Sequence, residues 1–293
     1  MTEGPETPRV EVDGVSATAG QLRAVAFNKY GHFTAMQVRN RRVRGLELHL
    51  ARLAAANREL FGAELDGVTV RDHIRHALGE DTRDASVRVY VHELGDWPSV
   101  VVTVRPPGGM LASPWKLQTV PYQRAVPHIK HASDFGQSYY RRLAQRNGFD
   151  EALLTGPGCV ISEGSITNIG FSDGTSIIWP DAPALAGITM QLLNRQLPGF
   201  GVTPRRAPVR TQDVNSFAAV FVMNVRGIAA VGKIDDRARL VFHCYGNHLF
   251  FAQAWTGDGN SGLAITKSRA ERAAERELGA TKAKSETVAL RNR

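Results

Sequence analysis

The chain has 293 residues and a mass of 32.0 kDa, more than one hydrophobic core usually holds, so we expect about two domains. Hydrophobic residues make up 43% and charged residues 22% of it, as in ordinary globular proteins. No apolar run of about eighteen residues occurs, and the N-terminus lacks a basic start followed by an apolar core. We therefore expect a cytoplasmic protein with neither a membrane span nor a signal peptide.

A net charge of +8 is compatible with nucleic-acid binding, so its distribution matters. Residues 263–293 hold eight Lys or Arg residues against four Glu residues, a surplus of four that is half of the total. The rest of the chain is only mildly basic, and no recognition motif accompanies the charge. We expect a solvated basic tail and no nucleic-acid partner.

Residues 8–105 alternate between predicted strands and helices. Alternating and continuous apolar runs mark the strands, and leucines at helical spacing mark the main helix. A Pro/Gly break at 106–109 is typical of a domain boundary. The predicted elements are a hairpin of strands 33–38 and 42–47, a helix over 46–62, and strands over 85–94 and 97–105.

A second group of predicted elements follows the break. Its longest helix, over 184–199, has its first turn around Gly187 to Thr189, and a glycine follows its last turn. The other elements are a strand over 116–122, an irregular segment over 123–136, a helix over 137–148, and strands over 150–156, 159–164, 175–180 and 217–224.

Helices and strands mix in both halves without an internal repeat, which predicts an α/β (α+β mixed) protein of two lobes. We place a smaller N-terminal α/β domain at 1–112 and a larger C-terminal domain at 113–240. An atypical segment occupies 241–293, and its charged tail from about residue 263 is predicted to be helical or disordered.

Cysteine, histidine and glycine patterns argue against three other kinds of site. Cys159 and Cys244 lie among apolar residues without motif spacing, which indicates a reducing compartment and no disulfide framework. His243, Cys244 and His248 lack a fourth ligand and match no zinc pattern, so we expect no metal. The G-x-G-x-x-G over 257–262 has no second strand of a βαβ unit after it, which argues against dinucleotide binding.

The segment "CVISEGSITNIGF" (159–171) places a carboxylate, Glu163, in a run that otherwise predicts a buried strand. Taking an unpaired carboxylate out of water costs several kcal/mol. Glu163 therefore needs a partner that is positively charged or donates hydrogen bonds.

A lysine, an arginine and a helix start supply complementary chemistry. Lys130 lies between apolar residues, and a partly desolvated lysine has a lowered pKa, so that its neutral amine is a nucleophile toward carbonyl groups. Arg52 on its helix face and the backbone N–H groups at Gly187 to Thr189 both suit a phosphate. Together with a buried carboxylate, these are the groups that pyridoxal 5'-phosphate (PLP) requires.

At these residues the sequence resembles the class IV (fold type IV) PLP-dependent aminotransferases, which include branched-chain and D-amino-acid aminotransferases and aminodeoxychorismate lyase. The resemblance covers about residues 25–235 and rests on the order and spacing of four segments. They are "GHFTAMQVRNRRVRGLELHLARL", "HIKH", "GFDEALLTG" followed by "SEGSITNIGF", and "LAGIT". The resemblance implies a two-domain fold with the cofactor between the domains, and a homodimer.

The resemblance also implies a role for each matched residue. Lys130 would form the Schiff base and then act as general base and acid at the substrate Cα. Glu163 would keep the pyridine nitrogen protonated. Arg52, Ile188 and Thr189 would bind the phosphate of the cofactor. Asn168 would support the strand beside the cofactor ring.

Three functions remain open. An aminotransferase would exchange an amino group between an amino acid and a 2-oxo acid. In this function Arg88 would bind the substrate carboxylate. A lyase of the aminodeoxychorismate type would eliminate pyruvate with the same cofactor and lysine. A non-catalytic or impaired member is the third alternative, and it is favoured only if the Val225 change and the altered C-terminus abolish cofactor binding. Compared with the family, Met190 replaces a common Arg, Met223 and Val225 replace hydroxyl residues, and the resemblance ends near Arg237.

Taken alone, several of these residues have ordinary structural explanations. Arg52 suits an ion pair with Glu47 or Glu59 on the same helix. Glu163 suits the cap of a turn, and Arg88 suits a solvated strand position. Only their combination indicates a cofactor site.

Overall fold

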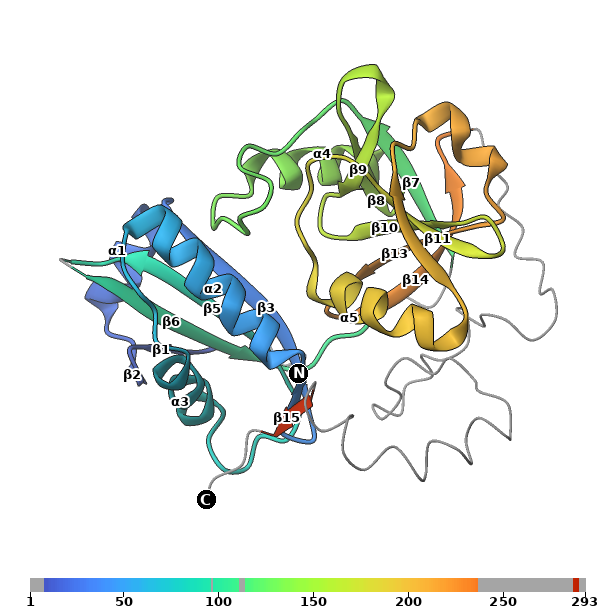
Figure 1. The fold of residues 1–293 in the computed structure, drawn as a ribbon. Helices are drawn as coiled ribbons and strands as arrows, with labels where there is room; N and C mark the ends of the chain where they lie inside the picture. The colour runs from blue at the N-terminus through green and yellow to red at the C-terminus, as the bar shows by residue number, and fades with distance from the viewer. Residues whose placement is uncertain (1–7, 96, 111–113, 237–286, 290–293) are drawn as a thin grey trace, which may run out of the picture. The chain divides into compact units, whose positions relative to one another are not determined.

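The protein is described by a computed structural model that covers residues 8–95, 97–110, 114–236 and 287–289. It divides into two compact units (Figure 1). The segment Ile129–Ser133, which carries Lys130, groups with the N-terminal strands and not with its sequence neighbours. Among the described residues, unit 1 comprises 8–95, 97–108, Ile129–Ser133 and Thr287–Ala289, and unit 2 comprises 109–110, 114–128 and 134–236.

Unit 1 is built on an antiparallel sheet with the strand order β15-β4-β3-β5-β6-β1-β2. The predicted hairpin is confirmed, and Asn40 and Arg41 form its turn with positive φ angles of 48° and 58°. Two positive φ angles match the turn to the twist of the flanking strands. The strands are β1 (Arg9–Val12), β2 (Val15–Ser16), β3 (Gly31–Arg39), β4 (Arg42–Arg44), β5 (Ala85–Glu93), β6 (Pro98–Arg105) and β15 (Thr287–Ala289).

Helices α2 (Leu46–Phe61) and α3 (Gly67–Leu78) cover one face of this sheet (Figure 1), whereas α1 (Ala19–Phe27) buries none of its residues. The predicted helix over 46–62 is thus confirmed. Side chains alternate along β5, so its valines enter the core beneath the helices while Arg88 and Tyr90 point to the opposite face. That opposite face carries polar and aromatic side chains.

Unit 2 is built on a mixed sheet with the order β12-β11-β10-β13-β14-β7-β8-β9. Three of its pairs are parallel, namely β11 with β12, β14 with β7, and β7 with β8. The strands are β7 (Trp115–Val120), β8 (Glu151–Thr155), β9 (Ile161–Gly164), β10 (Asn168–Ser172), β11 (Ser176–Pro180), β12 (Thr203–Ala207), β13 (Ala219–Asn224) and β14 (Gly227–Ile234).

The helices of unit 2 bury apolar side chains against this sheet. Helix α4 (Phe135–Arg146) packs on β7 and β8, and α5 (Ile188–Gln196) packs on β13. Three 3-10 turns complete the unit: η1 (Pro157–Cys159), η2 (Leu197–Phe200) and η3 (Thr211–Ser216). Both units therefore confirm the prediction of a mixed α/β fold.

The structure differs from the sequence-based expectations at Cys159 and in the C-terminal tail. Cys159 is exposed at the end of η1 with a φ of 57°, so the prediction of apolar surroundings was wrong for this residue. Of the tail expected to be helical or disordered, only Thr287–Ala289 is described, and it forms β15, which pairs with β4. Cys244, the neighbouring histidines and the glycine pattern over 257–262 lie outside the described residues.

Candidate active site

Lys130 lies at the edge of β3 in unit 1. The backbone N–H of Phe33 donates to the Lys130 carbonyl at 2.8 Å, and the N–H of Ala132 donates to the Gly31 carbonyl at 2.8 Å. His32 and His131 form the bridge between these two hydrogen bonds. The irregular segment that carries Lys130 therefore extends the sheet as a short antiparallel strand, although about a hundred residues separate it from β3.

Arg52 and His49 lie three residues apart on α2, next to this segment. His49 is buried, and its Nδ1 is 2.6 Å from the Thr34 hydroxyl. Its pKa falls from 6.5 to about 3, first because of burial and then because of the positive charges of Arg52 and Lys130. His49 is therefore neutral near neutral pH, and the two cations that act on it give this part of unit 1 a local positive charge.

Arg88 lies on the face of unit 1 opposite the α2 and α3 helices. Its Nη1 donates to the Tyr90 hydroxyl at 3.1 Å, and the Tyr90 ring stacks on Phe33 with 4.9 Å between centroids. The ring of Phe33 in turn lies 4.8 Å from Nζ of Lys130. Two cations, Arg88 and Lys130, thus flank one stacked aromatic pair.

Glu163 is buried on β9 of unit 2, at 4% exposure, as its sequence predicted. Its Oε1 accepts a hydrogen bond of 3.0 Å from Arg124, and its Oε2 accepts one of 3.2 Å from the N–H of Leu185. The required partner within unit 2 is therefore Arg124, which sequence reasoning did not single out.

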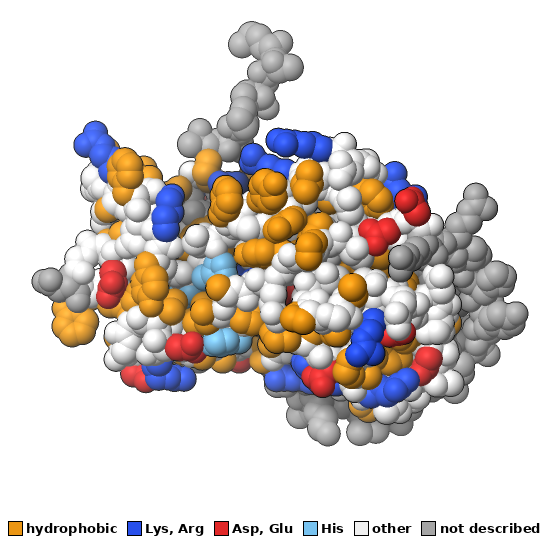
Figure 2. Space-filling model, turned by 90° about the horizontal axis from the view of Figure 1, so that it is seen from above, with side chains coloured by type: hydrophobic (Ala, Val, Ile, Leu, Met, Phe, Trp, Pro, Cys, Tyr) orange, Lys and Arg blue, Asp and Glu red, His pale blue; other side chains and the backbone are white. Residues whose placement is uncertain are grey.

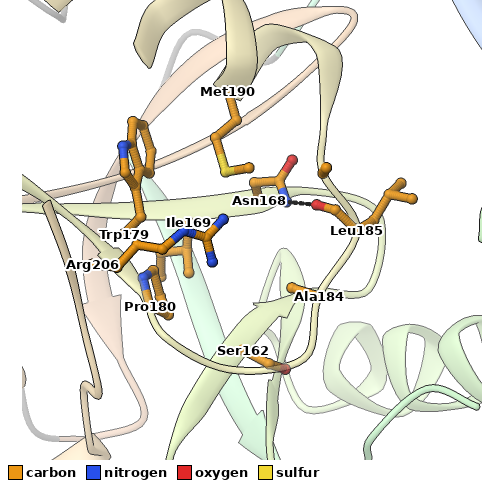
Figure 3. A pocket seen from close by; sticks show the side chains of 10 residues that line it. Ser162, Asn168, Ile169, Trp179, Pro180, Ala184, Leu185, Met190 and Arg206 are labelled. Carbon is orange, nitrogen blue, oxygen red and sulfur yellow. Dashed lines mark hydrogen bonds between the residues drawn. The ribbon is translucent and has the colours of Figure 1, made fainter. Parts of the chain in front are cut away.

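Asn168 and the start of α5 form a second cluster in unit 2. The Asn168 side chain donates to the Leu185 carbonyl at 2.7 Å (Figure 3), and a Cβ on Gly187 would overlap its Oδ1. Gly187 caps α5 without a side-chain hydrogen bond, so the first N–H groups of the helix have no side-chain cap. Thr189 uses its hydroxyl proton on the Asn224 carbonyl at 2.8 Å, which leaves its backbone N–H as the donor for an anion.

A small pocket in unit 2 lies beside this cluster (Figure 3). Met190 projects toward it from α5, and Trp179 and Arg206 come from the neighbouring strands β11 and β12. Met190 also packs against the core cluster that contains Trp179, so the methionine at this position is accommodated by apolar contacts. The remaining lining residues are Ser162, Ile169, Pro180, Ala184 and Ala186, together with Asn168 and Leu185.

Glu151, at the start of β8, is a second buried carboxylate of unit 2, and the sequence did not reveal it. It accepts hydrogen bonds from the N–H of Ser165 at 3.1 Å and from the Ser165 hydroxyl, and Nε of Arg141 lies 3.9 Å away. Burial raises the pKa of Glu151 to about 7, against the opposing effects of Ser165 and Arg141. It therefore titrates near neutral pH.

The positive charge of the protein does not gather in one place on the face shown in Figure 2. Its Lys and Arg side chains form several separate groups with hydrophobic and uncharged side chains between them.

Within the described residues, no group of three or more His, Cys, Asp or Glu side chains is placed to hold a metal ion. Nor does that part of the chain contain a helix whose length and apolar character would let it cross a bilayer.

Comparisons with solved structures identify the same fold in aminotransferases. A hypothetical aminotransferase from Mycobacterium tuberculosis in a PLP-bound form is 19% identical, with a TM-score of 0.66 over 75% of this chain and 86% of the other. A fold IV transaminase from Curtobacterium pusillum is 22% identical, with a TM-score of 0.64 over 73% and 82%. A branched-chain aminotransferase from the archaeon Thermoproteus uzoniensis, solved with norvaline, is 16% identical, with a TM-score of 0.67 over 79% and 89%.

The sequence supplies the family assignment independently. A comparison with curated proteins gives no match. The family model "Amino-transferase class IV", however, matches residues 31–234, which span well over half of the chain and include Arg52, Lys130, Glu163 and Thr189. The chain therefore belongs to the class IV aminotransferases.

Proposed function

We propose that this chain is a PLP-dependent aminotransferase that exchanges an amino group between an amino acid and a 2-oxo acid, with Lys130 as the lysine that binds the cofactor. The observation that carries the proposal is the buried carboxylate of Glu163, whose negative charge Arg124 and the Leu185 N–H stabilise. A fixed, buried anion is the partner that a protonated pyridine nitrogen needs.

The other donors fit the remaining groups of PLP. Lys130 supplies an amine for the aldehyde, and Arg52 supplies a permanent positive charge beside the same stretch of unit 1. In unit 2, the N–H groups of Ile188 and Thr189 at the uncapped start of α5 suit a phosphate. Because the Thr189 hydroxyl donates to Asn224, the backbone N–H groups would provide this contact.

The chemistry is divided between the cofactor and the chain. When bound, PLP supplies an aldehyde carbon that condenses with amines and a ring that withdraws electrons. Lys130 would hold the cofactor through Nζ, and the same amine would serve as the base for the proton of the substrate Cα. Glu163 would keep a proton on the ring nitrogen, and Arg88, which donates to the Tyr90 hydroxyl, would bind the substrate carboxylate.

The choice of substrates to test follows from the solved relatives. The Thermoproteus uzoniensis enzyme is named for branched-chain amino acids, and a structure of the Mycobacterium tuberculosis protein contains alpha-ketoglutarate. We therefore propose to screen branched-chain and other amino acids as donors against 2-oxoglutarate and pyruvate as acceptors. We also propose that the active form is a homodimer, which light scattering on the purified protein would test.

The decisive experiment loads the full chain with PLP and measures both the visible absorption of bound cofactor and the formation of 2-oxo acid from each donor. Lys130→Ala should abolish both, whereas Lys116→Ala, at an exposed lysine of β7, should change neither. Release of pyruvate from aminodeoxychorismate without amino exchange would instead establish the lyase. Failure of the wild-type chain to bind PLP would contradict both enzymatic functions.

A further inference from the structure

Phe33 holds Lys130 through both its backbone and its side chain. Its N–H donates to the Lys130 carbonyl at 2.8 Å, and its ring lies under the lysine amine, with Nζ 4.8 Å from the ring centroid. The ring is itself fixed by stacking on Tyr90 at 4.9 Å and an interplanar angle of 20°. The lysine amine therefore rests on a platform whose orientation the sheet determines.

The ring face is an electrostatic partner for the amine. An aromatic face carries negative charge density and attracts an ammonium group, more strongly where water is partly excluded. Both Phe33 and Lys130 are half-buried. The contact thus favours the protonated amine over the neutral amine, in addition to restricting where Nζ lies.

Other charged and titratable groups of unit 1 that act near this amine include one arginine and three histidines of lowered pKa. Arg52 on α2 is a like charge, which disfavours a second cation. His49 on α2 is kept neutral by burial, and burial likewise lowers the pKa of His32 on β3 to about 4 and that of His92 on β5. Arg88, which donates to the Tyr90 hydroxyl on the aromatic face, is a further cation.

We infer that Phe33 is a positioning residue for Lys130: its ring holds the amine in place and stabilises it in the protonated state. The inference rests on the proposed function only in naming Lys130 as the cofactor lysine. In the proposed reaction Nζ would accept the proton of the substrate Cα and would pass it on to a carbon of the cofactor, so that Lys130 would be an ammonium group between these two transfers. A ring beneath Nζ lowers the energy of that state, and an aliphatic side chain of similar size would not.

The test measures the titration of the Lys130 amine in the full chain freed of cofactor. Trace acetylation at a series of pH values, followed by mass spectrometry of the lysine peptides, gives an apparent pKa for each amine. We compare the wild type with Phe33→Leu, which removes the ring, and Phe33→Tyr, which keeps it. Phe149→Leu is the matched control, because the Phe149 ring lies 5.8 Å from Nζ of a different lysine, Lys233, in unit 2.

In Phe33→Leu we expect the apparent pKa of Lys130 to fall by about half to one pH unit, the size of an ordinary cation–π contact. Phe33→Tyr should restore it, and Phe149→Leu should leave it unchanged. If Phe33→Leu folds poorly, Phe33 can instead be replaced by phenylalanine that carries one, two or three ring fluorines. Fluorine withdraws negative charge from the ring face at nearly constant shape, so the apparent pKa of Lys130 should fall stepwise with each fluorine. Identical titration of Lys130 in all these proteins would overturn the inference.

The same variants separate this inference from the proposed function. If Lys130 titrates as expected but the wild-type chain does not bind PLP, the proposed function fails and the role of Phe33 stands. If PLP binds and amino exchange occurs while Phe33→Leu leaves the titration of Lys130 unchanged, the role of Phe33 fails and the proposed function stands.

Discussion

Arg124 and Glu163 form an ion pair of 3.0 Å in which both side chains are almost fully enclosed, at 5% and 6% exposure. The same Nη1 atom of Arg124 donates to the Pro127 carbonyl at 2.9 Å. One guanidinium thus ties the carboxylate of β9 to the loop that leads to Lys130. A buried pair of this kind depends on both partners, because removing one leaves an uncompensated charge in the interior.

We predict that Arg124→Met destabilises the protein by about 3–5 kcal/mol at about pH 8, the usual cost of an uncompensated buried charge. Loss of the Arg124 charge would raise the folded-state pKa of Glu163 relative to that in the wild type. Relative to the wild type, stability is then lost as pH rises through that folded-state pKa, so the deficit should shrink at about pH 5. Urea unfolding at the two pH values measures the difference.

The double variant Arg124→Met/Glu163→Gln is the control for this interpretation. It removes both charges, so it should recover much of the stability lost in Arg124→Met, and it should do so chiefly at the higher pH. If Arg124→Met is as stable as the wild type at about pH 8, the ion pair does not neutralise Glu163.

Glu151 leads to a prediction about wild-type stability. Its pKa is raised from 4.5 to about 7 by burial, so the folded protein holds this proton at pH values where the unfolded chain has released it. The contribution of this group to stability is complete below about pH 4.5 and is lost as pH rises through about 7. A pKa shift of this size corresponds to about 3 kcal/mol in the free energy of unfolding.

Glu151→Gln should remove this pH dependence, since the amide retains the shape and does not titrate. We expect the wild type to lose more stability than the variant between about pH 5 and about pH 8.5, measured from urea unfolding curves. Equal losses in both proteins would mean that Glu151 titrates with an ordinary carboxyl pKa.

Arg52→Gln should weaken PLP binding by about 10-fold to 100-fold, because a hydrogen bond to a charged group contributes about 1.5–3 kcal/mol. The affinity for pyridoxal, which lacks the phosphate, should not change. Equilibrium dialysis with both compounds measures the two affinities. Arg58→Gln, at an exposed arginine of the same helix that pairs with Glu64, is the control. An equal loss for pyridoxal would show that Arg52 does not act on the phosphate.

Local patterns in the sequence predicted the elements that local interactions form. The hairpin around Asn40 and the helix from Leu46 to Phe61 need only their own turn residues and apolar spacing. The burial of Glu163 also followed from its apolar neighbours. What the sequence did not reveal is which residues meet across long separations: Arg124 is 39 residues from Glu163 and belongs to no regular element.

The placement of Lys130 shows the same limit. Nothing in the spacing of "VPHIKHAS" indicates that its backbone pairs with β3, because short antiparallel pairing of an irregular segment has no periodic pattern. The sequence therefore assigns Lys130 to the second domain, whereas the structure groups it with the first unit. Phe33 was missed for the same reason, since its contact with Lys130 depends on that pairing.

Gly187 gives a prediction that isolates a single contact. Its φ of −65° is one that any residue adopts, so Gly187→Ala introduces no backbone strain. The added Cβ would overlap Oδ1 of Asn168, and Asn168 must then give up its 2.7 Å hydrogen bond to the Leu185 carbonyl or displace the start of α5. We expect a loss of about 1–3 kcal/mol in the free energy of unfolding.

Gly199→Ala is the matched control, because a Cβ there meets no atom within 4 Å, and this variant should unfold like the wild type. A double-mutant cycle identifies the cause: in an Asn168→Ala background, Gly187→Ala should cost far less, since the overlapping amide is gone. An equal cost in both backgrounds would show that the methyl group acts elsewhere. Weaker PLP binding by Gly187→Ala, with wild-type affinity in Gly199→Ala, would in addition support the start of α5 as the phosphate contact, because displacing this turn moves the N–H groups of Ile188 and Thr189.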